Sequence, residues 1–348
     1  ERADELERMQ RRRLPDGWDR SLPTWPADAR GMSGRDASSA ALNAIAPRVP
    51  WLMGGAADLA PSTRTRLTFA GAGDFQPDDR AGRNFHFGVR EHAMGAIVNG
   101  LSLSKIRAYG SGFLIFSEYQ RQPIRLGALM QIPTILIFTH DSIGVGEDGP
   151  THQPVEQLPS LRSMPGLVVL RPGDANEVAE AWRVIMRFER QPAVLVLSRQ
   201  AMPTLDRSRY APASGVARGA YVLASESGSA PPEVILMATG TELSLVVGAH
   251  EQLTREGVRS RVVSMPSWEL FERQPADYRR SVLPPEVTAR VAVEQASSFG
   301  WDRYVGPTGE TIGMHTFGAS APLKDVQRRF GFTPERVLEA ARAQLGRR

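Results

Sequence analysis

The chain has 348 residues, a length typical of about two domains, and its 41% hydrophobic and 23% charged content is ordinary for a globular protein. It contains no cysteine, which excludes disulfides, thiol catalysis and cysteine–zinc sites. No apolar run is long enough to cross a membrane and no signal peptide opens the chain, so we expect a cytoplasmic protein without a membrane partner.

The net charge is +4, and nearly all of the basic charge is arginine, because Lys105 and Lys324 are the only lysines. Apart from Arg11, Arg12 and Arg13, the arginines are scattered, and no alternation of aromatic and basic residues marks a nucleic-acid surface. We therefore expect no nucleic-acid partner.

Residues 1–30 begin with a charged, helical pattern and continue with a segment rich in proline and tryptophan. This composition predicts a helix followed by an extended linker. The first residue is not methionine, so we expect either a portion of a longer protein or a processed or separately encoded subunit.

Residues 31–205 alternate strand-like and helical patterns. Asp174 and Glu177 have the spacing of a helix N-cap with an acid three residues on, which predicts a helix to about Arg190. Strands alternating with helices predict a mostly parallel sheet that is covered on both faces. The strand candidates are Trp51–Met53, Phe85–Val89, Thr134–Thr139, Leu167–Leu170 and Val194–Leu197.

Residues 206–219 are rich in proline, serine and glycine and read as a linker, and residues 220–348 form a second α/β unit. We therefore predict an α/β protein of two doubly wound domains with mostly parallel sheets. The expected elements of the second unit are strand Val234–Ala238, a helix to about Glu256 with Gly257 at its end, strands Arg261–Met265 and Val291–Glu294, and a last helix from Thr333–Pro334 to about Leu345.

Residues 139–154 read THDSIGVGEDGPTHQP and follow an apolar stretch, which is where an α/β protein places ligand chemistry. Gly144 to Gly149 matches the spacing GxGxxG, but Pro150 and Pro154 prevent the helix that would bind a dinucleotide pyrophosphate. Its histidines and acids fit no zinc spacing either. The run favours a polar substrate site.

Polar residues follow three predicted strands of the first unit: Ser62, His140 and Arg199. Carboxyl ends of parallel strands meet at one sheet edge, so these side chains should converge. Arginine and histidine with hydroxyl support predict a phosphate clamp.

Two further features leave alternatives open. Glu91 lies in the first turn of a predicted helix, where it is either an acid favoured by the helix dipole or a carboxylate held near a protein interface. Phe113, Phe116 and Tyr119 recur at three-residue spacing, which is typical of core packing in a helix but also of a ligand-stacking platform.

Together these segments resemble transketolase, the thiamine-diphosphate enzyme of the pentose phosphate pathway. GGAADLAPS, FGVREHAMGAIVNG, THDSIGVGEDGPTHQP, LSRQAMP and FGFTPERV occur in the order of that family and cover nearly all of residues 30–348. The resemblance implies a pyrimidine-binding domain over 31–205, a transketolase C-terminal domain over 220–348, and transfer of a two-carbon ketol unit from a ketose phosphate to an aldose phosphate.

The resemblance also assigns roles to residues. Glu91, His140 and His152 would be catalytic, with Glu91 contacting the aminopyrimidine of thiamine diphosphate in general acid–base work. Phe113, Phe116 and Tyr119 would stack on the cofactor, with Asp58 nearby. Arg35, Ser62, His140 and Arg199 would bind the sugar phosphate, and Asp148 and His152 the sugar hydroxyls.

One departure is large. The family binds the diphosphate and its Mg²⁺ or Ca²⁺ through GDG in an N-terminal domain, and no GDG occurs here. We therefore expect the missing domain to belong to a longer chain or to a separate subunit of about 300 residues. Alone, this chain should have little or no catalytic activity. The resemblance also implies a homodimer.

Two other interpretations stay open. One is a related thiamine enzyme, dihydroxyacetone synthase or deoxyxylulose-phosphate synthase, although His140 with GEDGPTHQP favours transketolase over the latter. The other is a non-catalytic binding or regulatory protein that retains the fold.

Overall fold

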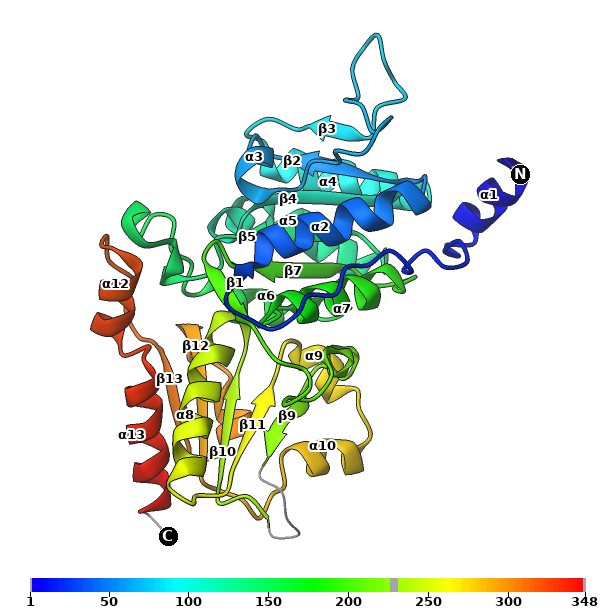
Figure 1. Ribbon diagram of the computed structural model, residues 1–348. Coiled ribbons are helices and arrows are strands. Elements are labelled where there is room, and N and C mark those ends of the chain that lie inside the picture. Colours follow the sequence, from blue (N-terminus) through cyan, green and yellow to red (C-terminus); the bar gives the residue numbers. More distant parts are fainter. Residues whose placement is uncertain (1, 226–230, 347–348) are drawn as a thin grey trace.

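A computed structural model describes residues 2–225 and 231–346, which form two α/β domains stacked end to end (Figure 1). Helix α1 (Arg2–Gln10) projects from the first domain, and an irregular segment runs from it to β1 (Asp28–Ser33), as the sequence predicts. None of the described helices combines the length and apolar character that crossing a bilayer requires.

The first domain is built on a sheet whose six strands, within the described residues, all run parallel in the order β3-β2-β4-β5-β7-β6. This confirms the expected parallel sheet. The strands are β2 (Leu52–Ala56), β3 (Asn84–His86), β4 (Arg107–Phe113), β5 (Ile135–Thr139), β6 (Val168–Leu170) and β7 (Ala193–Leu197).

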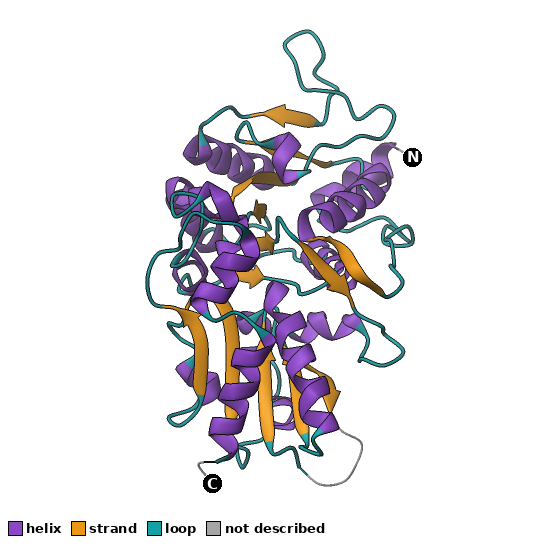
Figure 2. Ribbon diagram, turned by 60° about the vertical axis from the view of Figure 1, so that its left-hand side comes forward, coloured by secondary structure: helices purple, strands orange, loops and turns teal. Residues whose placement is uncertain are grey.

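Helices cover both faces of this sheet (Figure 2). Along β5, Ile135 and Ile137 belong to the core under α2 (Gly34–Ile45) and α7 (Ala175–Met186). Leu136 and Phe138 belong to the core on the other face. That face carries α4 (Glu91–Leu103), α5 (Ser117–Leu129) and α6 (Gln157–Arg162). A strand buried on both faces has a continuously apolar sequence, which is why β5 was predictable.

Strand β4 was not predicted. Its sequence RAYGSGF contains two glycines and an arginine, so it reads as a turn, yet the whole strand is buried. At Gly110 a Cβ atom would lie 3.1 Å from Met94 Cγ, so the missing side chain lets α4 pack closely on the sheet. Phe113 therefore ends a strand, whereas Phe116 lies in the 3₁₀ segment η2 (Leu114–Phe116) and Tyr119 in α5.

Several other predicted bounds differ, and β2 and β12 (Arg290–Ser297), for example, each end three residues later than predicted. The strand expected over Phe85–Val89 ends at His86, because Gly88 takes a left-handed φ of 68°. The helix capped by Asp174 ends at Met186 instead of Arg190, although its cap is as expected, since Asp174 Oδ1 accepts a hydrogen bond from Glu177 N (2.8 Å).

The second domain has a sheet in the order β13-β12-β10-β11-β9, and in the described part of the chain only β9 is antiparallel to its neighbour. Helices α8 (Leu243–Arg255) and α13 (Pro334–Leu345) cover one face, and α9 (Trp268–Glu272), α10 (Ala276–Val282) and α11 (Asp302–Val305) the other. The strands are β9 (Tyr221–Ser225), β10 (Val234–Ala238), β11 (Ser260–Ser264), β12 (Arg290–Ser297) and β13 (Glu310–Met314).

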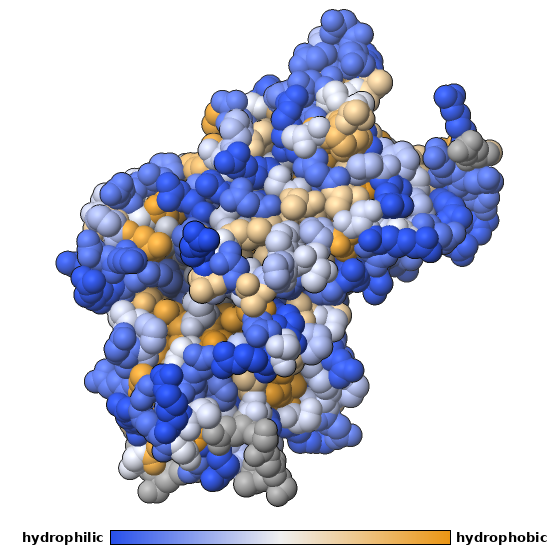
Figure 3. Space-filling view, viewed as in Figure 1, coloured by the Kyte–Doolittle hydropathy of each residue, from blue (hydrophilic) through white to orange (hydrophobic). Residues whose placement is uncertain are grey.

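The two domains are closely joined. A single apolar cluster contains Leu170 and Leu197 of the first domain together with Leu236 and Leu243 of the second. Apolar side chains also gather at the surface where the domains meet (Figure 3). Helix α12 (Leu323–Phe330) reaches back from the second domain to the 3₁₀ segment η3 (Ile143–Asp148) of the first.

The remaining elements are short. β1 pairs antiparallel with β8 (Ala201–Thr204) beside the main sheet. The others are α3 (Ala60–Thr63), η1 (Ala46–Arg48), η4 (Ala213–Arg218) and η5 (Gly240–Glu242).

Candidate functional site

The residues singled out in the sequence lie around the carboxyl ends of the first sheet. Asp58 and Ser62 follow β2, Glu91 follows β3, His140 follows β5 and Arg199 follows β7. Because these strands are parallel neighbours, the loops after them share one edge of the sheet.

His140 has an unusual backbone and a fixed ring. Its φ is 60°, a left-handed value that costs energy for a non-glycine residue, and it is 4% exposed. The ring stacks on Phe113 with centroids 3.7 Å apart and planes 28° apart, and Nδ1 is 2.8 Å from Thr139 Oγ1. With Nδ1 occupied, Nε2 is the atom left for a ligand.

The surroundings of His140 are basic. Burial and then the charges of Arg35, Arg199 and His152 lower its pKa to about 3, so the imidazole is neutral at neutral pH. Burial also lowers the pKa of Arg35, and the charges of Arg199 and Arg64 lower it further against the opposing effect of Asp36. These cations therefore lie within electrostatic range of one another and of His140.

One hydrogen-bond donor of Arg35 has no partner among the described residues. Its Nη1 donates to Ser62 O (2.9 Å), but its Nε is buried and has no partner among the described residues. A buried donor without an acceptor is costly, and a bound anion would satisfy it. The arrangement of Arg35, Ser62, His140 and Arg199 therefore suits a phosphate group.

Aromatic rings form a ladder beside this cluster. Phe113 and Phe116 are stacked with centroids 5.9 Å apart, and Phe116 and Tyr119 follow at 6.1 Å. His152 meets Phe116 edge-on at 5.6 Å. The ladder runs from buried Phe113 to Tyr119, which is 65% exposed, so it offers a ring face to a planar ligand.

Glu91 is the first residue of α4 and is 8% exposed. No hydrogen bond or ion pair of its carboxylate links it to another described residue. Helices α4 and α5 run parallel, because a Cβ at Gly95 would touch Pro123 and Gln120 while Asn99 Nδ2 donates to Pro123 O (2.8 Å). Glu91 lies one helical turn before Gly95. Because the two helices run parallel, Glu91 is level with the start of α5, where the aromatic ladder ends.

The loop that carries Asp148 and His152 is clamped by the second domain. Gln153 Nε2 donates to Gly146 O (2.8 Å) within the loop and to Ala319 O (2.9 Å) across the domain junction. Ser320 Oγ donates to Glu147 O (2.5 Å). Asp148 is exposed on this loop, and His152 is half-buried against the aromatic ladder.

Asp58 lies at a separate hollow of the same edge. Its φ is 61°, and with Arg64 and Gly88 it lines a cavity of about 520 Å³ between the ends of β2 and β3. The structure therefore places Asp58 in a space open to a ligand, whereas no contact joins it to His140 or to the aromatic ladder in the described part of the chain.

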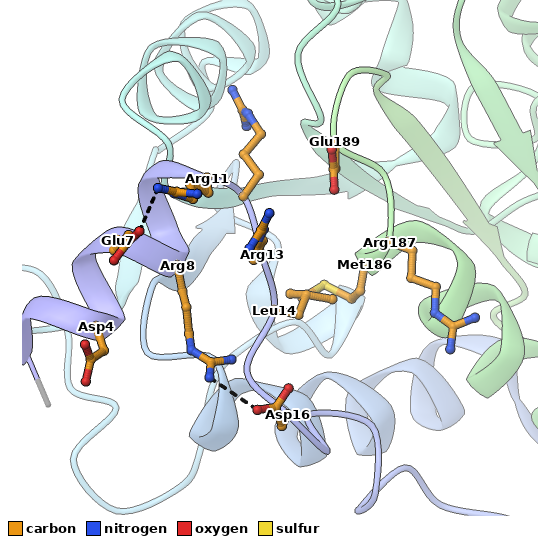
Figure 4. Close-up of a pocket in the computed structure, with 11 residues that line it drawn as sticks. Asp4, Glu7, Arg8, Arg11, Arg13, Leu14, Asp16, Met186, Arg187 and Glu189 are labelled. Carbon is orange, nitrogen blue, oxygen red and sulfur yellow. Dashed lines mark hydrogen bonds and ion pairs between the residues drawn. The ribbon is translucent and has the colours of Figure 1, made fainter.

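A larger hollow of about 780 Å³ lies between α1 and the end of α7 (Figure 4). Its arginines are largely engaged, since Arg8 pairs with Asp16 (3.2 Å), Arg11 pairs with Glu7 (2.8 Å) and Arg12 donates to Ser102 O (2.9 Å). Ser102 lies in the last turn of α4, so this hollow lies at the opposite edge of the sheet from His140.

Comparison with known proteins identifies the family. A profile described as "Transketolase, pyrimidine binding domain" matches residues 30–204, and one described as "Transketolase-like TK C-terminal domain" matches residues 219–333.

The chain belongs to the transketolase family. It is 51% identical to a transketolase of Halalkalibacterium halodurans over 333 residues, which are 95% of this chain and 49% of that protein. It is 49% identical to a transketolase of Geobacillus stearothermophilus over 348 residues, covering 100% of this chain and 52% of that one.

Among solved structures, a transketolase from Leishmania mexicana matches with a TM-score of 0.92 and 43% identity over 99% of this chain and 49% of that chain. The chain thus spans about half the length of the transketolases it matches, and it corresponds to their C-terminal portion.

Sequence reasoning missed two charged residues near the site, Arg64 and Arg171. Arg64 adds a cation beside Arg35, and Arg171 binds Asp141, the residue after His140. Arg171 directly follows β6, so the rule that selected Ser62, His140 and Arg199 at strand ends would have found it too.

Proposed function

We propose that this chain is the pyrimidine- and sugar-phosphate-binding half of a thiamine-diphosphate-dependent transketolase, which transfers a two-carbon ketol unit from a ketose phosphate to an aldose phosphate. Family membership supports this reaction. The observation that carries it is the convergence, at one sheet edge, of an aromatic ladder, the Glu91 carboxylate, which bonds to no other described residue, and a group of cations around a neutral histidine.

The aromatic ladder and Glu91 fit an aminopyrimidine ring. Phe116, with Phe113 and Tyr119 beside it, would stack on the ring, and the Glu91 carboxylate would hydrogen-bond its edge. In this role Glu91 would act as a general acid–base group toward the ring. When bound, thiamine diphosphate supplies the carbon nucleophile and the electron sink.

The cationic group fits the sugar phosphate. The free Nε of Arg35, together with Arg199 and Ser62, would bind the phosphate oxygens. Neutral His140, together with His152, would orient the sugar by hydrogen bonds from its hydroxyls to the ring nitrogens. Asp148 would accept hydrogen bonds from the sugar hydroxyls, and Asp58 would face the cofactor from its own hollow between the ends of β2 and β3.

The rest of the assembly is also part of the proposal. The diphosphate and its Mg²⁺ or Ca²⁺ would be bound by an N-terminal diphosphate-binding domain, in a longer chain or in a separate subunit. Among the described residues, no group of three or more histidine, aspartate or glutamate side chains is placed to hold a metal ion. The cytoplasm is the proposed location.

We further propose a homodimer whose interface includes α4 and α5. These helices expose an apolar surface that we define by Ile97, Leu126, Leu129 and Met130. Leu126, Leu129 and Met130 share one helix face because they are three and four residues apart, and exposed apolar surface of this kind marks interfaces. Glu91 and Tyr119 lie near the starts of the same two helices, so the interface would border the proposed cofactor site.

Reconstitution tests the proposal. The chain is mixed with the N-terminal half of the Halalkalibacterium halodurans transketolase, thiamine diphosphate and Mg²⁺, and ketol transfer between sugar phosphates is followed by mass spectrometry. Product should form only with both halves and should disappear with Glu91→Gln. An assembled pair, shown by light scattering, that forms no product would favour a non-catalytic protein.

The intact mass of the native protein tests the arrangement separately. A mass near 38.1 kDa with a co-purifying partner indicates a split enzyme, whereas a much larger mass indicates that this chain is part of a longer protein.

A further inference from the structure

Arg171 is fully buried where the two domains meet and contacts both. On the first-domain side its Nε donates to Asp141 Oδ2 (2.9 Å), and its Nη2 lies 2.8 Å from the same oxygen as a charge contact. On the second-domain side its Nη1 donates to Thr239 Oγ1 (2.9 Å) and to Glu242. One guanidinium therefore bridges the residue after His140 and the loop after β10.

The guanidinium of Arg171 lies at the carboxyl end of β10 in the second domain. β10 pairs with β11 on one side and with β12 on the other, so the strand order reverses there, and a doubly wound sheet opens a ligand crevice at such a point. Gly240 makes room for it: its φ is 54°, and a Cβ would lie 2.5 Å from Arg171 Cζ. An arginine of the first domain thus fills the crevice of the second.

A second arginine completes the cluster. Arg162 binds Glu294 through two hydrogen bonds, Nη1 to Oε2 (2.8 Å) and Nη2 to Oε1 (2.7 Å). Thr239 Oγ1 also donates to Glu294 Oε1 (2.5 Å). The buried cluster therefore holds two cations, Arg162 and Arg171, and three carboxyl groups, those of Asp141, Glu242 and Glu294.

Asp141 connects this cluster to the site. It directly follows His140, whose left-handed φ must be held by its surroundings because a non-glycine residue relaxes from that region when released. The Asp141 carboxylate is tied to Arg171 and also accepts from Ser142 Oγ (3.2 Å), so the peptide on the C-terminal side of His140 is fixed. The Phe113 stack and Thr139 hold the ring from the other side.

We propose that Arg171, held by Thr239 and Glu242, is a positioning residue that acts through Asp141 to set the backbone and ring of His140. The second domain contributes none of the site residues predicted from the sequence, yet it would thereby determine the geometry of the phosphate-binding histidine. The effect on ligand binding rests on the proposed function, but the effect on His140 does not.

The test uses Asp141→Asn in this chain. The substitution keeps the side-chain shape, and Arg162 and Arg171 each retain a carboxylate partner, so the variant should fold. The chain has six histidines, so ¹³C-histidine labelling gives few ring signals, and His140→Gln assigns the one of interest. In the wild type that signal is shifted by the Phe113 ring 3.7 Å away.

With Asp141→Asn the signal of His140 should move to the position of an unstacked histidine. Inorganic phosphate, titrated against the same samples, should bind about tenfold more weakly, the loss that one displaced hydrogen-bonding group causes. Arg171→Lys should give an intermediate shift, because one ammonium group cannot hold Asp141 and Glu242 in the same geometry.

Glu294→Gln is the matched control. It weakens the Arg162 contact between the domains, whereas the glutamine amide oxygen can still accept the hydrogen bond from Thr239 Oγ1 that Glu294 accepts. It should therefore lower the melting temperature and leave the His140 signal in place. A His140 signal that stays unmoved in folded Asp141→Asn, or that moves equally in Glu294→Gln, overturns the proposal. If Asp141→Asn does not fold, the position of the His140 signal in Arg171→Lys tests the proposal in its place. Absence of phosphate binding to the wild type would count against the proposed function only.

Discussion

The ring of His140 lies 3.7 Å from the ring of Phe113, centroid to centroid, and this contact joins the cationic group to the aromatic ladder. Because the imidazole is buried among arginines, its pKa is about 3 in the folded chain and about 6.5 when unfolded. The unfolded state therefore takes up a proton first, and stability is lost as pH falls below about 6.5.

His140→Asn tests this linkage, since asparagine tolerates the left-handed backbone. Between pH 7 and pH 5 the wild type should lose about 2 kcal/mol more unfolding free energy than His140→Asn, as urea denaturation measures. Parallel pH profiles for the two proteins would contradict the depressed pKa.

Glu91→Gln should abolish catalytic activity while leaving the stability of the chain nearly unchanged. The carboxylate bonds to no other described residue, so a neutral amide of the same shape should lose only a favourable helix-dipole contact of about 0.3–1 kcal/mol. We expect unfolding free energy to change by less than about 1 kcal/mol, and reconstituted turnover to be abolished. Calorimetry and initial rates check both, and Glu335→Gln in the first turn of α13 is the control that should retain activity.

Arg199→Gln should weaken phosphate binding without unfolding the chain, because Arg199 is exposed. Loss of one charge-assisted hydrogen bond corresponds to roughly tenfold lower affinity, measured by isothermal titration with inorganic phosphate. Arg329→Gln, an equally exposed arginine on α12, should leave the affinity unchanged. Equal affinities in all three proteins would place the anion elsewhere.

Gly240→Ala and Gly257→Ala form a matched pair, since both glycines have left-handed backbones, with φ of 54° and 76°. Nothing lies within 4 Å of a Cβ at Gly257, so that substitution should cost only the backbone term of about 1–2 kcal/mol. Gly240→Ala adds a clash with Arg171 and should cost about 1–3 kcal/mol more. Denaturant unfolding compares the two, and equal costs would mean that Arg171 can move aside freely.

Leu129→Glu tests the proposed dimer. Leu129 is 67% exposed on α5, so a charge there should not disturb the core but should prevent association, and light scattering should show the monomer mass. Phe299→Glu, at an exposed aromatic of the second domain, should leave the dimer intact. A wild-type chain that is already monomeric at micromolar concentration would contradict α4 and α5 as a self-association surface.

The predictable parts of the fold were those with a strong local signal. β5 and β10 are continuous apolar runs, and Asp174 and Thr333 accept the cap hydrogen bonds that their positions suggested. β4 was missed because its glycines serve packing against α4, which no local pattern reveals. Phe113 and Phe116 were consequently assigned to a helix, whereas Phe113 ends β4 and Phe116 lies in η2.

Long-range partners were beyond sequence reasoning. Glu177 has the spacing of a reciprocal cap, but its carboxylate accepts from Gly173 N (2.7 Å) and from Tyr221 and Ser264 of the second domain (both 2.6 Å). Burial and nearby Asp174 raise its pKa, an effect that depends on the whole interface. The same holds for Arg171, whose partners are 30 to 71 residues away along the chain.

Insertion of Arg171 into the crevice beside Gly240 limits how these sequences can be recombined. A chimera that joins residues 1–205 of this chain to the corresponding half of a relative must retain a glycine opposite the guanidinium and a carboxylate to receive it. Two halves that each fold well in their own parents can therefore be incompatible with each other, and the crossover between them is safest in pairs of parents that share both residues.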